Sequence, residues 1–139
     1  MSLPLPLENI RLSQEARDRL VTLKRRTGIA NWNVLCRWAL CRSLAEETPP
    51  PRFQAPADSN VEMSWRVFAG AYGDVFLGLL KVRCKRDGLP LDAPTLAEQF
   101  RLHLHRGIGY LAADRSISSI RDLFRLALSR SSSASWIRR

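Results

Sequence analysis

Cationic side chains between residues 11 and 26 are the clearest candidates for chemistry in this sequence. If residues 14–27 form a helix, at about 100° per residue the cations follow both flanks of a narrow apolar stripe, with one behind it. Two such rows are suited to binding a polyanion such as DNA, because contacts to its phosphate oxygens add affinity without recognising the base sequence. A solvated helix face would carry the same charges, so the group indicates more than any single member does. The group comprises Arg11, Arg17, Arg19, Lys24, Arg25 and Arg26.

A second cluster of cations lies in the stretch 74–86. Lys81 and Lys85 are four residues apart and therefore share one side of a helix, with Arg83 and Arg86 beside them. The other positions of this stretch are apolar nearly all the way round, which is typical of a buried helix. The charges therefore predict the border of an interface, either with DNA or with another subunit.

The two histidines do not predict a metal site. His103 and His105 would point about 200° apart on a helix, so they cannot share one ion, and His103 is expected to be a satisfied core histidine. Gly107 and Gly109 sit in a helical pattern and not after a strand, so they predict close helix packing or a kink and no phosphate loop. No cofactor and no metal are expected.

The three cysteines offer little sulfur chemistry. No C-x-x-C pair occurs, and three widely spaced cysteines make no disulfide framework, which favours a reducing compartment. A sulfur carrier needs an exposed thiolate of low pKa. Cys36 and Cys41 lie among apolar residues, and Cys84 is the least implausible carrier because Lys81 and Lys85 flank it.

The first basic group is positioned by a strand followed by two helices within residues 7–44. Residues 8–12 alternate polar and apolar side chains as a strand does, Ser13 is the expected cap of a first helix that Gly28 ends, and Asn31 begins a second. A short strand with no partner in this stretch predicts pairing with a copy from a second chain. That arrangement is typical of a ribbon-helix-helix dimer, whose two-stranded ribbon can enter the DNA major groove.

The rest of the chain is expected to be helical. The predicted fold is one mainly α domain over residues 1–139, in which the ribbon-helix-helix-like unit is extended by about three further helices into an oligomer. A Pro-rich linker covers 46–60, a helical remainder covers 61–128 and a basic mobile tail covers 129–139. Within the remainder, 61–72 is ambiguous between a strand and the start of a helix. The last helix is expected to turn Ile120, Phe124 and Ala127 inward and Arg121 and Arg125 outward.

Length, composition and charge limit the classes to which this protein can belong. The chain has 139 residues, 45% of them hydrophobic, which suffices for a core. The net charge of +9, from 22 Lys+Arg against 13 Asp+Glu, is typical of nucleic-acid binders, although heavy arginine use also follows from a GC-rich genome. No apolar run approaches the roughly 18 residues of a membrane span and no signal peptide is visible, so a cytoplasmic protein without a membrane partner is expected.

Four sequence blocks together resemble the DndE family, small accessory proteins of the DNA phosphorothioation (DNA sulfur modification) system. In order they are NIRLSQEARDRLVTLKRRTGI, VLCRWALCRSL, GAYGDVFLGLL and FRLHLHRGIGYL. The resemblance implies a homotetramer that is not an enzyme and that holds duplex DNA, intact or nicked, while other phosphorothioation proteins replace a phosphate oxygen with sulfur. The Pro-rich stretch 48–58 and the tail after Leu128 depart from the family pattern.

Two other functions stay open. A ribbon-helix-helix transcriptional regulator would read a specific DNA sequence through Asn9 and Arg11 on the strand. An assembly adaptor would use its arginines to pair with acidic partner proteins. An enzyme is least favoured, because no P-loop, catalytic triad or iron–sulfur cysteine set occurs.

Overall fold

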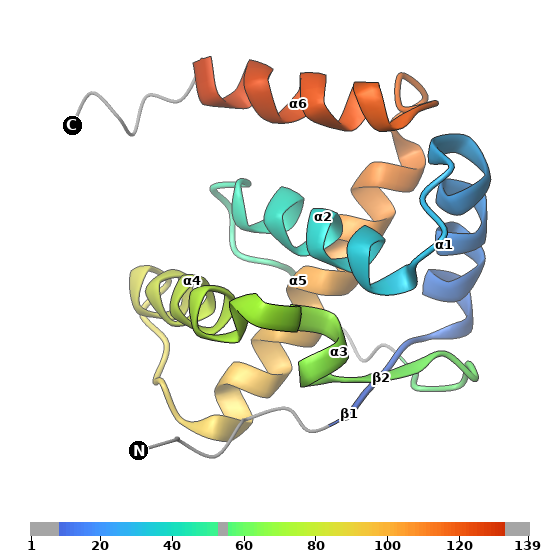
Figure 1. Cartoon of the computed structure of the whole chain (residues 1–139). Coiled ribbons are helices and arrows are strands. Elements are labelled where there is room, and N and C mark those ends of the chain that lie inside the picture. Colours follow the sequence, from blue (N-terminus) through green and yellow to red (C-terminus); the bar gives the residue numbers. More distant parts are fainter. Residues whose placement is uncertain (1–8, 53–55, 133–139) are drawn as a thin grey trace.

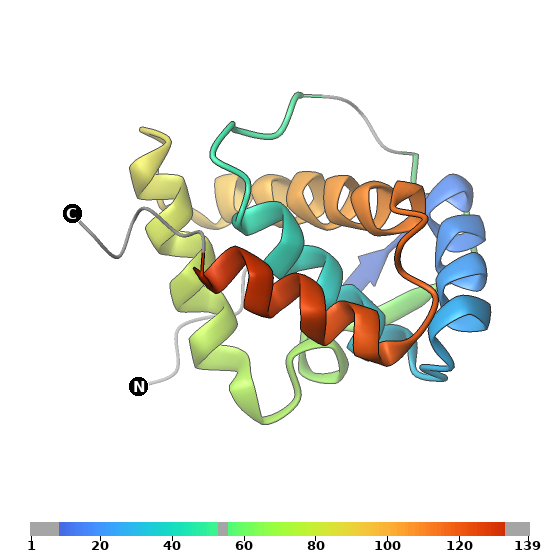
Figure 2. The same cartoon turned by 90° about the horizontal axis from the view of Figure 1, so that it is seen from above.

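Helices make up most of the structure, which confirms the predicted mainly α class. The computed structural model describes residues 9–52 and 56–132. In chain order the elements are β1 (Asn9–Arg11), α1 (Gln14–Thr27), α2 (Trp32–Leu44), β2 (Glu62–Ser64), α3 (Trp65–Ala69), the 3-10 helix η1 (Gly70–Tyr72), α4 (Gly73–Arg86), α5 (Ala93–Ala113) and α6 (Ile120–Ser132). Helices α2 and α5 cross at the centre, α1 and α4 lie on opposite sides of them, and α6 lies over α2 (Figures 1 and 2).

The first strand is paired within its own chain. β1 and β2 form a two-stranded antiparallel sheet in which Ile10 lies opposite Met63. The predicted pairing with a second copy is therefore wrong, because the ambiguous stretch 61–72 supplies the partner strand. Alternation along the strand is confirmed, since Ile10 and Leu12 are buried while Asn9 and Arg11 are exposed.

Helix α1 begins and ends where its sequence signals predict. The Ser13 side chain accepts a hydrogen bond from the backbone N–H of Ala16 at 3.1 Å, which satisfies one of the unpaired donors of the first turn. Gly28 has a φ of 77°, a left-handed conformation that glycine adopts without a steric penalty, and its N–H closes the last turn on the Lys24 carbonyl. The buried row of α1 is the predicted one: Ala16, Leu20, Leu23 and Thr27.

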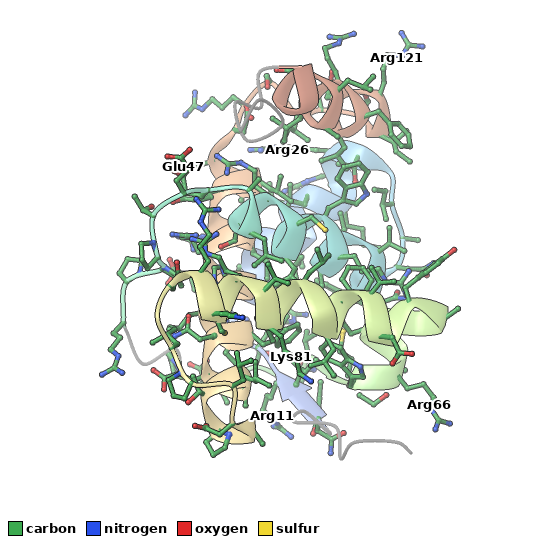
Figure 3. All side chains as sticks on the ribbon, turned by 90° about the vertical axis from the view of Figure 1, so that its left-hand side faces the viewer. Arg11, Arg26, Glu47, Arg66, Lys81 and Arg121 are labelled. Carbon is green, nitrogen blue, oxygen red and sulfur yellow. The ribbon has the colours of Figure 1, made fainter. Side chains whose placement is uncertain are left out.

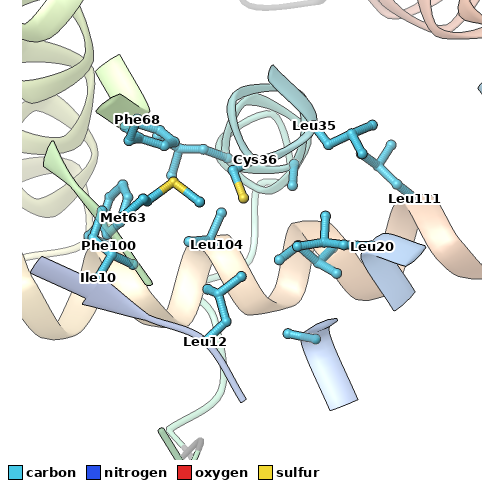
Figure 4. Close-up of a cluster of buried hydrophobic side chains, with 14 of the residues drawn as sticks. Ile10, Leu12, Leu20, Leu35, Cys36, Met63, Phe68, Phe100, Leu104 and Leu111 are labelled. Carbon is cyan, nitrogen blue, oxygen red and sulfur yellow. The ribbon is translucent and has the colours of Figure 1, made fainter. Parts of the chain in front are cut away.

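The core lies where α2 crosses α5, and a glycine sets how close they come. A Cβ at Gly107 would lie 1.7 Å from the carbonyl oxygen of Ala39, which confirms the prediction that this glycine permits close helix packing. Around this crossing the side chains of α1, α2, α5 and both strands interdigitate (Figure 4). The fully buried large residues include Phe68, Phe100, Leu12, Leu20, Leu35, Leu104 and Leu111.

Helix α4 is less buried than its composition predicts. Leu80, Arg83 and Cys84 face the core, whereas Val75 is 57% exposed and Val82 is 68% exposed. Although the apolar residues of α4 are distributed all the way round the helix, only one side packs against the core, and the other side is exposed to solvent.

Helix α6 turns a different side inward from the predicted one. Leu123 is fully buried, while Ile120, Phe124 and Ala127 are exposed. Phe124 still makes an edge-on contact with Trp38 of α2, with ring centroids 5.7 Å apart. The helix also extends to Ser132, so residues 129–132 of the predicted tail are helical, and 133–139 lie outside the described residues.

Candidate nucleic-acid interface

Two of the three exposed cations of α1 lie in its C-terminal half. Arg19, Lys24 and Arg25 are exposed, while Arg17 and Arg26 are half-buried. Glu15 lies in the first turn, where an acidic side chain is favoured by the helix dipole, and the last turn is basic. The N-terminal half of α1 is therefore nearly balanced in charge, and the net positive charge gathers at its other end.

Half of the predicted binding residues are engaged by neighbours within the chain. Arg11 forms an ion pair with Glu62 at 2.8 Å, and Arg19 forms one with Glu15 at 2.6 Å. Arg17 lies 3.7 Å from Asp18, and the Arg26 guanidinium donates to the Ala112 carbonyl at 2.9 Å. Within the part of the chain that the structure describes, the remaining four form no ion pair; they are Lys24, Arg25, Lys81 and Lys85.

The two predicted basic clusters do not meet in one chain. Helices α1 and α4 lie on opposite sides of the crossing of α2 and α5 (Figures 1 and 2). Lys81, on α4, therefore lies on the side of the protein away from α1 (Figure 3). One chain therefore presents two separate basic regions. We call Lys24 and Arg25, which lie in the last turn of α1 and form no ion pair within the described chain, the α1-end group.

A further cation, Arg115, follows the end of α5 that contacts the last turn of α1. The hydrogen bond from Arg26 to Ala112 holds the last turn of α1 against the C-terminal end of α5, and the exposed Arg115 follows in the next turn of chain. The two segments are almost ninety residues apart in the sequence, so no local pattern could have brought them together.

Arg83, expected at the border of an interface, is instead an internal residue. Its side chain is 4% exposed and forms an ion pair with Asp87 at 2.9 Å. The same guanidinium donates to the carbonyls of Leu44, Glu47 and Thr48. The Leu44 carbonyl belongs to the last residue of α2 and the other two follow it; a helix leaves acceptors unpaired at this end, so Arg83 caps α2 from α4.

A second arginine completes the cap from α5. Arg106 donates to the Ser43 carbonyl at 2.9 Å, to the Ser43 hydroxyl at 2.8 Å and to the Thr48 carbonyl at 2.8 Å. Ser43 also bonds the Nδ1 of His103 at 2.8 Å. Three helices are thus tied together by one buried polar cluster, which holds α4 and its cations in place.

Both histidines are structural, and each serves a different face of α5. His103 is fully buried in the polar cluster, and burial first, then the charges of Arg83 and Arg106, lower its pKa to about 4. His105 donates from Nδ1 to the Arg101 carbonyl and accepts the Ser13 N–H at Nε2, which ties the start of α1 to α5. Among residues 9–52 and 56–132, no group of three potential metal ligands occurs.

Acidification is expected to destabilise the fold through His103. Burial and the nearby guanidinium groups keep the native imidazole neutral, with a pKa of about 4, whereas the unfolded chain binds the proton near the ordinary pKa of 6.5. Between these values the unfolded state binds more protons, so stability falls as the pH falls, by about 2 kcal/mol at about pH 5 for this group alone. Urea unfolding at neutral pH and at about pH 5 measures the difference.

The control for that effect removes the imidazole. His103→Leu should lose less stability between the two pH values than the unchanged chain does, and His105, whose pKa is also lowered by burial, accounts for part of what remains. The same pH dependence in both proteins would contradict the role given to His103.

The cysteines are poor candidates for a sulfur carrier. Burial raises the pKa of Cys36 to about 12. Cys84 is buried, and burial, then Asp87, raise its pKa, although Arg83 acts in the opposite direction; the expected help from Lys81 and Lys85 is absent. Cys41 is exposed, contrary to the apolar setting expected for it, yet partial burial of its thiol also raises its pKa.

Comparison with known proteins points to one family. The model of the family described as DndE, DNA sulphur modification protein DndE, matches residues 9–119. A crystal structure of DndE from Escherichia coli B7A, involved in DNA phosphorothioation modification, is similar with a TM-score of 0.63 and 26% identity, over 80% of this chain and 99% of that one. A mutant DndE involved in DNA phosphorothioation is similar in fold, with a TM-score of 0.59 and 22% identity, over 78% of this chain and 97% of that one. A search of curated proteins found no match.

Proposed function

Because this chain belongs to the DndE family of DNA sulphur modification proteins, we propose that it is a non-catalytic DNA-binding subunit of the phosphorothioation machinery. The observation that carries the proposal is the α1-end group, in which Lys24 and Arg25 are exposed and have no ion-pair partner among the described residues. The Lys24 ammonium lies 5.8 Å from the centre of the Trp32 ring, which favours a fixed position for this charge. Such a surface binds phosphates and not bases.

The hydrogen-bonded side chains of Ser43 and His103 are closed to a substrate. Ser43 and His103 have the atoms of a nucleophile and a base, but both are fully buried, so no substrate reaches them. None of the helices in the described part of the chain is long and apolar enough to cross a membrane.

We propose that the protein acts as a homo-oligomer, and a homotetramer fits the family expectation. Support comes from the open side of α4, where Tyr72, Val75, Leu79 and Val82 expose apolar surface on one helix face. A second copy that covered this side would place Lys81 and Lys85 at the border of the contact. The α4 cluster would then join a DNA surface only in the assembly.

Of the other functions, the adaptor has more support than the regulator. A ribbon-helix-helix regulator needs strands from two chains side by side, whereas β1 is paired with β2 and Arg11 is engaged by Glu62. An adaptor remains compatible with the exposed arginines, and it would lose partner binding and keep DNA binding when those arginines are replaced.

DNA affinity is expected to depend steeply on salt through the α1-end group. The variant Lys24→Gln/Arg25→Gln should reduce the slope of log affinity against log salt by about 1.8, because each lost phosphate contact is worth about 0.9. Electrophoretic mobility shifts with random-sequence duplexes, intact and nicked, across a salt series measure the slope. We expect tighter binding to the nicked duplex, whose backbone is easier to distort, and equal affinity would count against that part of the proposal.

A matched double variant tests whether DNA binding depends on the position of the cations or only on the net charge of the protein. Arg52→Gln/Arg66→Gln removes the same number of charges from exposed positions on other segments. Arg66 is labelled in Figure 3, and Arg52 lies 3.8 Å from the carboxylate of Glu98. This double variant should leave the slope close to that of the unchanged protein. Equal losses in the two double variants would mean that net charge alone drives binding, and no binding at low salt would remove the DNA-binding role.

A further inference from the structure

Helix α6 lies outside the part of the chain that the DndE family model matches. The DndE family match ends at residue 119, one residue before α6 begins. The E. coli structure is covered over 99% of its own length by only 80% of this chain. What α6 presents to solvent is therefore a feature of this protein beyond the matched family core.

The outer side of α6 exposes a continuous apolar row. Ile120, Phe124 and Leu128 follow one another at intervals of four residues and are 47%, 53% and 71% exposed. The helix is attached to the rest of the protein by the buried Leu123 and by the edge-on contact of Phe124 with Trp38, so Leu128 and the exposed part of Phe124 remain open to solvent. A row at this spacing is the pattern by which one amphipathic helix packs on another.

Positive charge borders this row along one edge. Arg121 and Arg125 each follow a member of the row by one residue, and both are exposed. The one acid in the first turn, Asp122, accepts the N–H of Ser118 at 2.9 Å, and its other carboxylate oxygen lies 3.7 Å from the guanidinium of Arg125. Two arginines against one acid leave this edge with a net positive charge. Phe124, Leu128 and the two arginines line a shallow depression with Ser129, which we call the α6 groove.

We propose that the α6 groove docks an acidic amphipathic helix of another protein. Apolar side chains of the partner would cover Phe124 and Leu128, and its carboxylates would pair with Arg121 and Arg125. DNA would satisfy the arginines but leave the apolar row against phosphates. A second α6 would bring further arginines to an already positive edge, which is unfavourable. A membrane needs a wider apolar side than one row.

A designed peptide tests the groove on the full chain. The probe is a fluorescein-labelled helix of about 15 residues, with leucines at i, i+4 and i+7 and glutamates on the flanks; the same peptide with lysines for glutamates is the control. We expect fluorescence anisotropy to detect binding of the acidic peptide alone. Leu128→Ser should weaken binding at least about tenfold, since it removes most of one buried leucine, and Arg121→Gln/Arg125→Gln should have a similar effect.

Leu91→Ser is the matched control, because it makes the same replacement at a leucine that is 45% exposed between α4 and α5. It should leave peptide binding unchanged. Equal binding of the lysine peptide, equal loss in Leu91→Ser, or no binding of the acidic peptide would overturn the proposal. A lower sedimentation mass in Leu128→Ser would assign the groove to a second copy, and loss of binding to anionic vesicles would assign it to lipid; either result also overturns it.

Discussion

Replacing Gly107 with alanine is expected to lower the free energy of unfolding by about 3 kcal/mol or more. The added Cβ would lie 1.7 Å from the carbonyl oxygen and 2.4 Å from the carbonyl carbon of Ala39. Both are backbone atoms of α2, so no side chain can turn aside, and the helices must separate through the centre of the core. Thermal and urea unfolding should show the loss, with a melting temperature lower by roughly 10 °C for a chain of this size.

The matched control for Gly107 lies in α4. A Cβ at Gly78 would meet no atom within 4 Å, and this residue is also inside a helix. Gly78→Ala should therefore raise stability by about 0.5–1 kcal/mol, because alanine loses less conformational entropy than glycine when a helix forms. If Gly107→Ala and Gly78→Ala changed stability by the same amount in the same direction, the close approach of α2 and α5 would not be the reason that position 107 requires glycine.

The parts of the fold that the sequence predicts are those whose causes are local. Ser13, the buried row of α1 and Gly28 are set by contacts within one helix and its caps, so period and cap residues suffice to predict them. The partner of β1 is different. Arg11 and Glu62 are separated by about fifty residues and a Pro-rich stretch, and a three-residue strand leaves too short a pattern to identify.

The sequence shows which residues are cationic, but it does not show which of them are exposed and therefore available to a ligand. Lys81, Arg83 and Lys85 alternate on one helix, yet Arg83 alone is buried. The difference arises because α2 ends beside α4 and leaves carbonyls that need donors, a fact of tertiary structure. In the same way, Arg26 is engaged by the end of α5, and Arg115 gains significance only from that contact.

The buried arginine gives the second large expected effect. Arg83→Met should lower the free energy of unfolding by about 3–5 kcal/mol, because it leaves the Asp87 carboxylate, 7% exposed, without its partner. The carbonyls of Leu44 and Thr48 lose a donor at the same time. Lys85→Met, at an exposed position on the same helix, should change stability by no more than about 0.5 kcal/mol. Urea unfolding at neutral pH compares the two.

A double variant separates the cost of the unpaired charge from the loss of the cap on α2. Arg83→Met/Asp87→Asn removes both charges, so it should recover part of the stability that Arg83→Met loses, while the carbonyls after α2 stay without their donor. Full recovery would mean that the cap contributes nothing, and no recovery would mean that the ion pair contributes nothing. Partial recovery is the result expected if Arg83 does both, and α4 then carries Lys81 and Lys85 on a helix fixed in position by the end of α2.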